Sequence, residues 1–336
     1  MSSLVVLDAD VLGRERTGDE TYVANLLREL PRLTDAFRFA AVTRNPDLVP
    51  DGVEALPLPA RSQELRMVWS LPRLLRRIRP SLAHFQHAIP LRCPTPAVVT
   101  VHDLSFEHEP ELFGLKDRLV FRAVVPRAVK KAKWLIAVSE RTKSDLVELY
   151  GTDPHRITVA HHGVDQAFSP GGRPDSYALF VGAIQSRKNP LAAVDAAGAA
   201  GLRLVVAGPA RDRDLAQELE RRGADLRGYL TKPALADLYR GAACLVLPSR
   251  FEGFGLPVLE AMACGTPVVV APEPALREVA GDAAIYAEEP GLADAVRQAV
   301  RERDRWAAAG LARARGFTWE ETARRTLAAY ESALRT

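Results

Sequence analysis

Short apolar runs of strand length alternate with helix-length stretches along nearly the whole chain. Such runs, bounded by turn residues, are typical of buried strands in parallel sheets. Helical patterns lie between several of them, for example at residues 21–30 and 115–131. This alternation predicts βαβ units and an α/β fold with parallel sheets. The expected strands cover residues 4–7, 37–42, 82–85, 97–101, 134–138, 157–160, 178–181, 202–207, 244–247 and 268–270.

The chain is long enough for two such sheets. Its 336 residues exceed one ordinary hydrophobic core. Residues 166–176, QAFSPGGRPDS, gather proline, glycine and serine, as linkers between domains do. We therefore expect two Rossmann-like domains with a central cleft, and ligands at the carboxyl ends of the strands.

Composition excludes several classes of protein. Hydrophobic residues make up 47% of the chain and charged residues 26%, as in a soluble globular enzyme. A net charge of +3 gives no reason to expect a nucleic-acid partner. The cysteines, Cys93, Cys244 and Cys264, form no C-x-x-C pair, so the pattern supports neither a disulfide framework nor a zinc site. The first residues lack the features of a signal peptide and no apolar run approaches the ~20 residues that span a bilayer. A cytoplasmic protein is expected.

The most informative segment is residues 248–270, PSRFEGFGLPVLEAMACGTPVVV. It places Glu252 and Glu260 eight positions apart, with Gly253, Gly255 and Pro257 between them. Glycine lets the backbone approach a ligand closely, and proline suits the first turn of a helix. The amides at such a helix start bind phosphate, while carboxylates accept hydrogen bonds from hydroxyls. The segment therefore predicts a site for a nucleotide sugar.

This segment resembles the E-x7-E signature of retaining glycosyltransferases of family 4, also called glycosyl transferases group 1. The resemblance implies the GT-B architecture and covers most of the chain. It implies an acceptor-side domain at residues 1–165 and a donor-nucleotide domain at 172–317. The last stretch, 318–336, resembles the helix that returns to the first domain, and its apolar residues fall on one helical stripe.

Two adjacent cations, Arg187 and Lys188, follow an expected strand. Charge grows on the leaving diphosphate in the transition state, so cations placed there favour bond breaking. The resemblance implies that both contact the donor diphosphate. Many relatives carry a further arginine directly after the glycine at this strand end, where this chain has Ala183 after Gly182. We therefore expect Arg187 to carry more of that task.

The resemblance also assigns the donor site. Glu260 is expected to bind the ribose hydroxyls, and Glu252 to orient the donor sugar without acting as a nucleophile. The turn around Gly228, Tyr229 and Leu230 is expected to line the base pocket. Further backbone contacts to the donor are implied for Gly18, Gly253, Phe254, Gly255 and Leu256.

His102 and Asp103 end an expected strand of the first domain. The resemblance implies that His102 contacts the donor sugar, while Asp103 orients its loop or serves the acceptor. Relatives usually have asparagine where this chain has His162, and we interpret His161 and His162 as hinge structure.

The pair Asp8 and Asp10 forms a D-x-D pattern, which binds metal in the other, GT-A class of glycosyltransferases. Because every other feature here is of the GT-B kind, we expect no catalytic metal and no cofactor. The first loop, GRERTGDETY, keeps Thr17 and Gly18 but has Glu20 where a second glycine is common. A carboxylate repels a diphosphate, so Glu20 is expected to point away or to serve the acceptor.

Two basic stretches lie in the first domain. Residues 66–92 contain six arginines and no acid, and residues 116–143 contain nine basic residues and two acids. Such runs are usually solvated helix faces, but they also attract anionic lipid surfaces. Peripheral association with an anionic membrane, at the inner membrane surface, is therefore one open expectation.

These features together predict a metal-independent, retaining hexosyltransferase of polysaccharide biosynthesis. Its donor would be GDP-mannose or a UDP-hexose, with mannose as the first expectation because GAIQSRKN and LREVAGDAA look like mannosyltransferase relatives. Its acceptor would be a saccharide or a lipid-linked hydroxyl. The alternatives are a UDP-sugar epimerase and a catalytically inactive homologue that acts as a scaffold.

Overall fold

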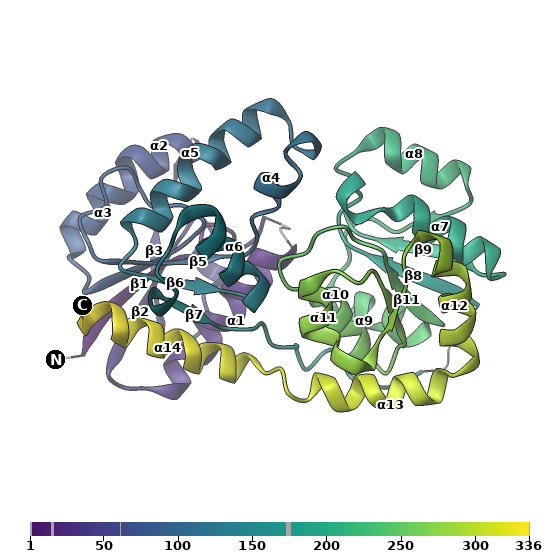
Figure 1. Ribbon diagram of the computed structural model, residues 1–336. Helices are drawn as coiled ribbons and strands as arrows, with labels where there is room; N and C mark the ends of the chain where they lie inside the picture. The colour runs from purple at the N-terminus through teal and green to yellow at the C-terminus, as the bar shows by residue number, and fades with distance from the viewer. Residues whose placement is uncertain (1, 15–16, 61, 173–175, 336) are drawn as a thin grey trace. The chain divides into compact units, whose positions relative to one another are not determined.

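The computed structural model describes residues 2–14, 17–60, 62–172 and 176–335. Residues 15 and 16 of the first loop and residues 173–175 of the expected linker lie outside this description. The chain divides into two compact units (Figure 1). Unit 1 comprises Met1–Gly163 and Trp319–Thr336, and unit 2 comprises Val164–Thr318.

Unit 1 is built on a seven-stranded sheet in which every pairing is parallel, in the order β3-β2-β1-β4-β5-β6-β7. The order reverses between β1 and β4, as in a doubly wound sheet. The strands are β1 (Ser3–Asp8), β2 (Phe37–Thr43), β3 (Val53–Pro57), β4 (Leu82–Gln86), β5 (Ala97–Val101), β6 (Trp134–Ala137) and β7 (Ile157–Val159).

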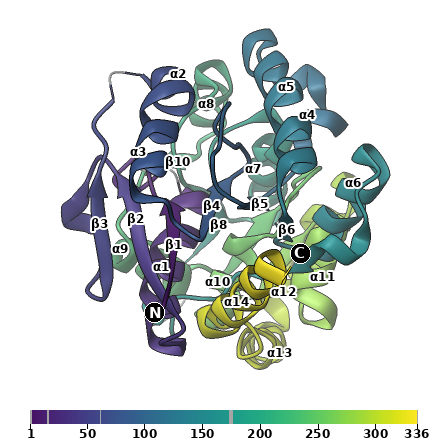
Figure 2. The same cartoon turned by 90° about the vertical axis from the view of Figure 1, so that its left-hand side faces the viewer.

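The helices of unit 1 cover both faces of this sheet (Figure 2). Helices α3 and α5 lie on one face, and α1 and α14 pack together on the other. Helix α6 is capped at its start by Ser139, whose hydroxyl accepts from the amide of Thr142, and ends at Gly151 with a φ of 62°. The helices are α1 (Thr17–Leu33), α2 (Gln63–Leu65), the π-helical turn η2 (Arg66–Ser70), α3 (Leu71–Ile78), α4 (Ser105–His108), α5 (Leu115–Lys131), α6 (Glu140–Tyr150) and α14 (Trp319–Arg335).

Unit 2 repeats the plan with a six-stranded parallel sheet in the order β10-β9-β8-β11-β12-β13. Helix α10 packs on α9 and α13, and α12 packs on α7. The strands are β8 (Tyr177–Val181), β9 (Arg203–Ala207), β10 (Asp225–Leu226), β11 (Cys244–Leu247), β12 (Val268–Val270) and β13 (Ile285–Tyr286). The helices are α7 (Pro190–Ala199), α8 (Arg213–Arg221), α9 (Lys232–Gly241), α10 (Leu256–Ala263), α11 (Pro274–Ala280), α12 (Leu292–Arg301) and α13 (Arg303–Ala314).

The expected fold class is confirmed, since both units hold all-parallel sheets with alternating helices. All ten expected strands are present, and β5, β11 and β12 have the predicted bounds. These three strands are buried at every residue, which is why their sequence signal is so clear. Three strands were missed. Strands β3, β10 and β13 are edge strands with polar or half-exposed residues, so no continuous apolar run marks them.

Within the part of the chain that the structure describes, no helix is both long and apolar enough to cross a bilayer.

Candidate active site

In unit 2, the site forms where the strand order reverses. Strands β8 and β11 are parallel neighbours, so their carboxyl ends meet at one edge of the sheet. The chain leaves β8 through Gly182 into a 3₁₀ turn, Ser186–Lys188, and leaves β11 into the loop before α10. Doubly wound sheets bind their ligands at this switch point. The topology therefore brings the two segments singled out in the sequence to the same place.

The basic pair and the first glutamate form one buried ion cluster. Lys188 Nζ lies 2.7 Å from Glu252 Oε1, and Arg187 Nη1 lies 3.8 Å from Glu252 Oε2. Burial disfavours the charged carboxylate, but Lys188 and then Arg187 hold the pKa of Glu252 below its ordinary value. Arg187 also donates to the carbonyl of Phe251. The cluster thus holds two cations in a fixed position around one carboxylate.

Three glycines, Gly182, Gly208 and Gly228, lie at the strand ends beside this cluster. A Cβ on Gly182 would lie 3.0–3.2 Å from the outer atoms of the Lys188 side chain, and one on Gly208 would lie 2.1 Å from the carbonyl oxygen of Gly182. The amide of Gly208 in turn donates to the carbonyl of Gly228 at 2.8 Å. All three have positive φ, which glycine adopts without strain. Because these three residues have no side chains, a ligand can approach their backbone closely.

The start of α10 is built as the segment predicts. Gly255 caps the helix with a φ of 105°, and a Cβ there would lie 2.8 Å from Leu276 Cδ2. Pro257 stands in the first turn, directly after Leu256. Phe254 is buried against Phe317, with ring centroids 6.1 Å apart. The contact with Phe317 therefore holds the loop that includes Gly253 in place directly before the first turn of α10.

The second glutamate, Glu260, lies in α10 and is half-buried. Its Oε2 accepts a hydrogen bond of 2.8 Å from Tyr239, which is fully buried. Burial raises the pKa of Glu260 to about 7, although the Tyr239 hydroxyl and Lys232 oppose the shift. A carboxyl group with this pKa is poised to accept or donate a hydrogen bond, as binding of ribose hydroxyls requires.

This raised pKa makes a prediction for stability. Because the pKa of Glu260 is higher in the folded state than its ordinary 4.5, folding favours the protonated form. The contribution of Glu260 to stability is thus complete below pH 4.5 and is lost as pH rises through about 7. We expect Glu260→Gln to flatten the pH dependence of the unfolding free energy across this window, measured by urea unfolding without nucleotide.

The matched control is Tyr239→Phe, which removes the hydroxyl that lowers the pKa and leaves the carboxyl group in place. It should steepen the same pH dependence. Equal slopes for the wild type and Glu260→Gln would mean that Glu260 ionises as an ordinary surface carboxylate.

The turn expected to read the base follows β10. Gly228 has a φ of 63°, and a Cβ there would meet nothing within 4 Å. Tyr229 is 46% exposed and Leu230 is half-buried. An exposed aromatic ring beside these glycines offers a surface on which a base can stack. Stacking alone does not distinguish uracil from guanine.

In unit 1, His102 follows β5 and is buried and neutral. Its Nε2 lies 2.9 Å from Gln86 Oε1, and its ring packs against Tyr22 with centroids 5.0 Å apart. Burial lowers the pKa of His102 to about 4, with Asp19 opposing and His87 adding to the shift. A neutral imidazole can exchange hydrogen bonds with a sugar hydroxyl without adding charge.

A buried network of hydrogen bonds supports the end of β5 that precedes His102. Tyr22 bonds Thr100 at 2.9 Å, Thr100 bonds His84 at 2.7 Å, and His84 bonds Tyr330 of α14 at 2.7 Å. The network joins α1, two central strands and α14, so it fixes the strand end that carries His102.

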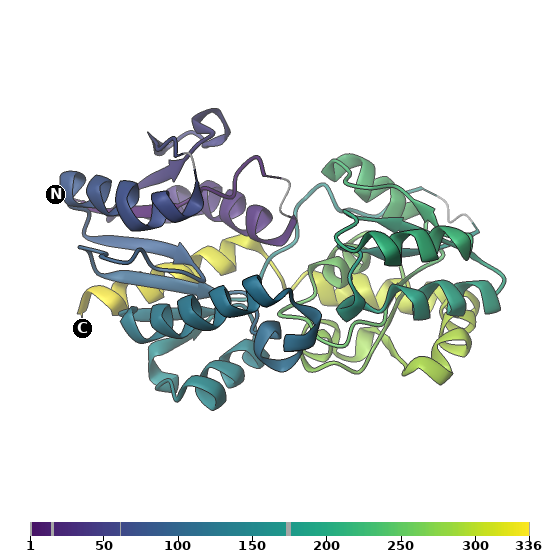
Figure 3. The same cartoon turned by 90° about the horizontal axis from the view of Figure 1, so that it is seen from above.

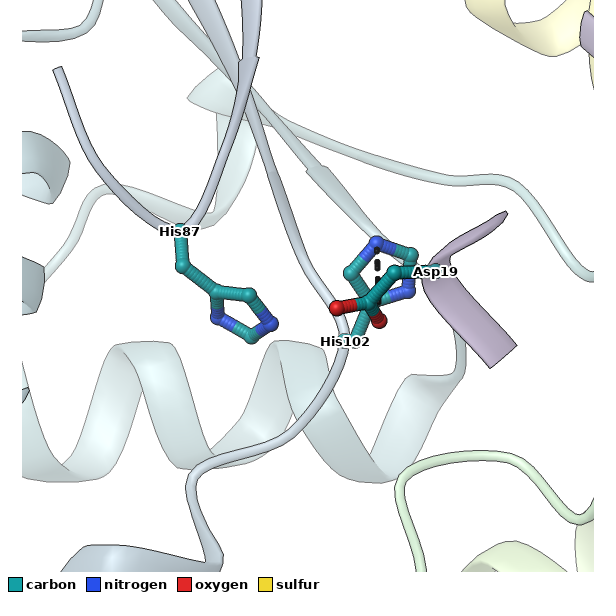
Figure 4. A group of neighbouring side chains, drawn as sticks. All are labelled: Asp19, His87 and His102. Atoms are coloured by element: carbon teal, nitrogen blue, oxygen red, sulfur yellow. Dashed lines mark ion pairs between the residues drawn. The ribbon is translucent and has the colours of Figure 1, made fainter. Parts of the chain in front are cut away.

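Two residues lie beside His102 in a contact that was not expected from the sequence. Asp19 Oδ1 lies 3.9 Å from His102 Nε2, and the His87 ring lies 5.2 Å from that of His102 (Figure 4). His87 has a φ of 56°, a backbone conformation that costs a side chain free energy and is often found at functional sites. His87 follows β4 just as His102 follows β5, so the same strand-end argument would have found it.

Within the described residues, Asp19, His87 and His102 are also the group whose ligand atoms lie close enough together, within 4.8 Å, to hold a metal ion. Because His102 Nε2 already bonds Gln86, binding a metal through that atom would cost this hydrogen bond.

The D-x-D residues bind arginines. Asp8 accepts two hydrogen bonds from Arg66, at 2.5 and 2.9 Å, and Arg66 is fully buried. Asp10 pairs with Arg44 at 2.9 Å and with Arg14. These carboxylates are therefore already neutralised by side chains of the fold.

The first loop is closed by Glu20, whose Oε1 accepts from the amide of Gly13 at 2.7 Å. Glu20 thus has a local structural task, which the sequence did not suggest. Gly18 lies in the first turn of α1, and a Cβ there would meet nothing within 4 Å. Asp103 accepts from the amide and hydroxyl of Ser105, so it orders the turn after β5.

The histidine pair 161–162 has structural partners. His161 offers its carbonyl to Thr322, and His162 is buried against Tyr22 and Trp319. Burial, followed by His102 and His161, lowers the pKa of His162 well below its ordinary value. Both residues thus help to seat the start of α14.

Comparison with known proteins gives two family matches that together span most of the chain. Residues 16–168 match the model described as Glycosyltransferase Family 4, and residues 167–310 match that of Glycosyl transferases group 1.

Among curated relatives, the chain is 30% identical to O-antigen chain mannosyltransferase B of Escherichia coli, over 70% of each protein. It is 36% identical to D-inositol 3-phosphate glycosyltransferase of Kribbella flavida, over 62% of this chain and 59% of the relative.

Among solved structures, HepE of Anabaena in complex with UDP and glucose aligns with a TM-score of 0.74 and 16% identity, over 99% and 100% of the two chains. WaaG, a glycosyltransferase involved in lipopolysaccharide biosynthesis, aligns with a TM-score of 0.73 and 18% identity, over 97% and 98%. These two likenesses establish a shared fold.

Proposed function

This chain belongs to glycosyltransferase family 4, and from that premise we propose that it is a retaining hexosyltransferase that uses a nucleotide diphosphate sugar. One observation carries the proposal furthest. Lys188 and Arg187 surround Glu252 at the switch point of the unit 2 sheet, beside the three glycines and the start of α10. Cations, backbone amides and a carboxylate at one place suit a diphosphate joined to a sugar.

The diphosphate, the ribose and the hexose of the donor each have chemical partners among the described residues. Arg187, Lys188 and the first amides of α10 bind the diphosphate, and Glu260 binds the ribose. Glu252 orients the hexose by accepting hydrogen bonds from its hydroxyls. Neutral His102, with Asp19 beside it, offers further hydrogen bonds to sugar hydroxyls.

The proposed step is a front-face displacement. The bond between the sugar C1 and the diphosphate oxygen breaks, and the acceptor oxygen bonds C1 from the same side. The acceptor proton passes to the leaving phosphate oxygen. Lys188 and Arg187 stabilise the negative charge that grows on this oxygen, and Glu252 stabilises the positive charge on the sugar.

Mannose is the first expectation for the sugar, and a saccharide or lipid-linked hydroxyl for the acceptor. The E. coli relative named as an O-antigen chain mannosyltransferase supports both choices. The second candidate is a phosphorylated cyclitol acceptor, because several relatives are named as D-inositol 3-phosphate glycosyltransferases. Against it, Asp19 and Glu20 add negative charge near the start of α1.

The test is an assay of the purified chain with GDP-mannose, UDP-glucose and UDP-N-acetylglucosamine as donors, preceded by a thermal-shift screen with GDP and UDP. We expect one nucleotide to stabilise the protein and its sugar to be transferred with retention of anomeric configuration, read by NMR. Activity should survive excess EDTA, since two cations and the α10 amides already neutralise the diphosphate. Matched acceptors, a mannoside and inositol 3-phosphate, separate the two candidates.

The contrary outcomes are distinct. Nucleotide binding without transfer to any acceptor would favour a scaffold, and an epimerised free sugar would favour a UDP-sugar epimerase. Loss of activity in EDTA with rescue by a divalent ion would direct attention to Asp19, His87 and His102, since Asp8 and Asp10 are bonded to arginines.

A further inference from the structure

Three side chains of unit 1 that offer metal-binding atoms lie together at one end of its sheet. Asp19 stands in the first turn of α1, His87 directly follows β4, and His102 directly follows β5. Strand β4 pairs with β1 on one side and with β5 on the other, and α1 is the helix that follows β1. In Figure 3, α1 (purple) starts at the end of unit 1 toward which the blue strands point. Three neighbouring parallel strands therefore bring these side chains to one place.

The three side chains are spaced closely enough to share one ion. One ligand atom from each lies within 4.8 Å of the other two. His102 Nε2 is 3.9 Å from Asp19 Oδ1, and a ring nitrogen of His87 points toward this pair (Figure 4). Ligand atoms around a tetrahedral zinc ion lie about 3.3 Å apart, so these gaps must shorten by at most about 1.5 Å. Small side-chain rotations are enough, and Asp19, 36% exposed, has room to make them.

His87 is held by its backbone in an unusual conformation. Its amide donates to the carbonyl of Thr100 in β5 at 2.9 Å, and the amide of Ala88 donates to the carbonyl of Gln86 at 2.5 Å. These bonds close a three-residue turn around His87, whose φ is 56°. Three-residue turns with positive φ are rare and strained, and such strain is found chiefly at ligand sites. Among the described residues, the buried Nδ1 of His87 has no hydrogen-bond partner, so the fold uses this nitrogen for no contact of its own.

The carboxylate of Asp19 is not neutralised by a cation of the fold. No lysine or arginine of the described chain forms an ion pair with it. Another aspartate beside a histidine gives the contrast: Asp145 lies 3.0 Å from His108 but also 3.1 Å from Arg141. Asp10 is likewise paired with arginines. Asp19 therefore keeps its charge for a cation from outside the chain.

The kind of ligand indicates the kind of metal. Two imidazoles and one carboxylate suit zinc, whereas magnesium and calcium prefer sites made of oxygen atoms. Zinc bound by three protein ligands keeps a fourth position open. Where zinc bonds His102 through Nε2, the ring proton moves to Nδ1 and the hydrogen bond to Gln86 is replaced.

We propose that Asp19, His87 and His102 bind a zinc ion, and that the bound ion inhibits sugar transfer. Binding of zinc does not depend on the transfer reaction. Inhibition rests on the proposed function, in which His102 and Asp19 offer hydrogen bonds to the donor sugar, because zinc takes up the same atoms. The ion is not needed for transfer, so this site is consistent with activity in excess EDTA.

Binding is tested on the full chain without a histidine tag, after treatment with EDTA and dialysis. The protein is titrated with Co²⁺, whose visible absorption is much stronger in four-coordinate than in six-coordinate sites. We expect one strongly absorbing cobalt ion per chain, displaced by zinc. His87→Asn and Asp19→Asn should each weaken zinc binding by more than about 100-fold, since even residues behind a metal ligand contribute about 10–100-fold.

Two features of these variants guard against misfolding. Asparagine accepts a positive φ more readily than most side chains, so it suits position 87. Asp19→Asn keeps the shape of a partly exposed side chain. The matched control is His108→Asn, which removes an imidazole beside a carboxylate elsewhere in unit 1 and should bind zinc like the wild type.

Inhibition has its own readout. Zinc should inhibit transfer by the wild type near its dissociation constant, excess donor should relieve the inhibition, and EDTA should restore activity. Each variant is compared with its own activity without zinc. His87→Asn should need about 100-fold more zinc for the same fractional inhibition, and His108→Asn should behave like the wild type.

Weak cobalt absorption of the six-coordinate kind, or equal loss of binding in His87→Asn and His108→Asn, would overturn the zinc site. Bound zinc that leaves transfer unchanged would overturn the inhibition. Thermal shift with GDP and UDP is measured separately. A chain that binds neither nucleotide and transfers no sugar would contradict the proposed function, while a strong cobalt spectrum lost in His87→Asn would still support the zinc site.

Discussion

Replacing Lys188 with methionine is expected to lower turnover by a factor of about 10²–10³, with a much smaller change in donor affinity. Lys188 Nζ lies 2.7 Å from Glu252 and beside Gly182. In our proposal it meets the leaving diphosphate oxygen, whose charge is greatest in the transition state. Steady-state kinetics and a separate nucleotide-binding measurement would resolve turnover from affinity.

Stability is the confounding effect, because removing Lys188 leaves the buried carboxylate of Glu252 with the more distant Arg187 as its neighbouring cation. The double variant Lys188→Met/Glu252→Gln removes both charges and tests for this. It should recover stability but not turnover. A variant that changed only the Michaelis constant would show that Lys188 binds ground state and transition state equally.

Replacing Arg66 with methionine should destabilise unit 1 by about 3–5 kcal/mol. Arg66 is fully buried, bonds both oxygens of Asp8 and lies 3.5 Å from Asp10. Without it, Asp8 is left largely buried and unpaired, whereas Asp10 keeps Arg44. Urea unfolding followed by tryptophan fluorescence reports chiefly on unit 1, which holds Trp69, Trp134 and Trp319.

The control for charge is Arg38→Met, an exposed arginine of β2 whose loss should change stability by no more than ~0.5 kcal/mol. The double variant Arg66→Met/Asp8→Leu should regain most of the lost stability, because it removes the unpaired carboxylate as well. Equal destabilisation in the single and double variants would place the effect in packing of the Arg66 stem.

The strands show how far the sequence predicts the fold. Strand β11 was predicted at its true bounds, because a buried parallel strand is apolar on both faces and therefore continuous in sequence. Strand β10 was missed because only two residues pair there and both are half-buried. A short edge strand forms because it pairs with a neighbouring strand. Which strand is its neighbour depends on the topology of the sheet, not on the local sequence.

The candidate site was also predicted only in part: its local features were predicted, and the contacts between distant residues were not. The E-x7-E segment predicted that Pro257 stands in the first turn of a helix and that Glu260 lies within it, since both depend on local backbone. The contact between Lys188 and Glu252, 64 positions apart, required that β8 and β11 be neighbours, which no local pattern states. The contacts of Asp19 and His87 with His102 were likewise not predicted, because they too depend on which strands and helices are neighbours.

Unit 2 is one uninterrupted stretch, Val164–Thr318, and its ends are joined, since the amide of Val164 donates to the carbonyl of Phe317 at 3.2 Å. A segment with adjacent ends can be cut out at two junctions and exchanged without stretching the rest of the chain. The residues proposed to bind the nucleotide all lie within it. Donor preference should therefore move with unit 2. A chimera that carries unit 2 of a relative should use the donor nucleotide of that relative and the acceptor of this chain.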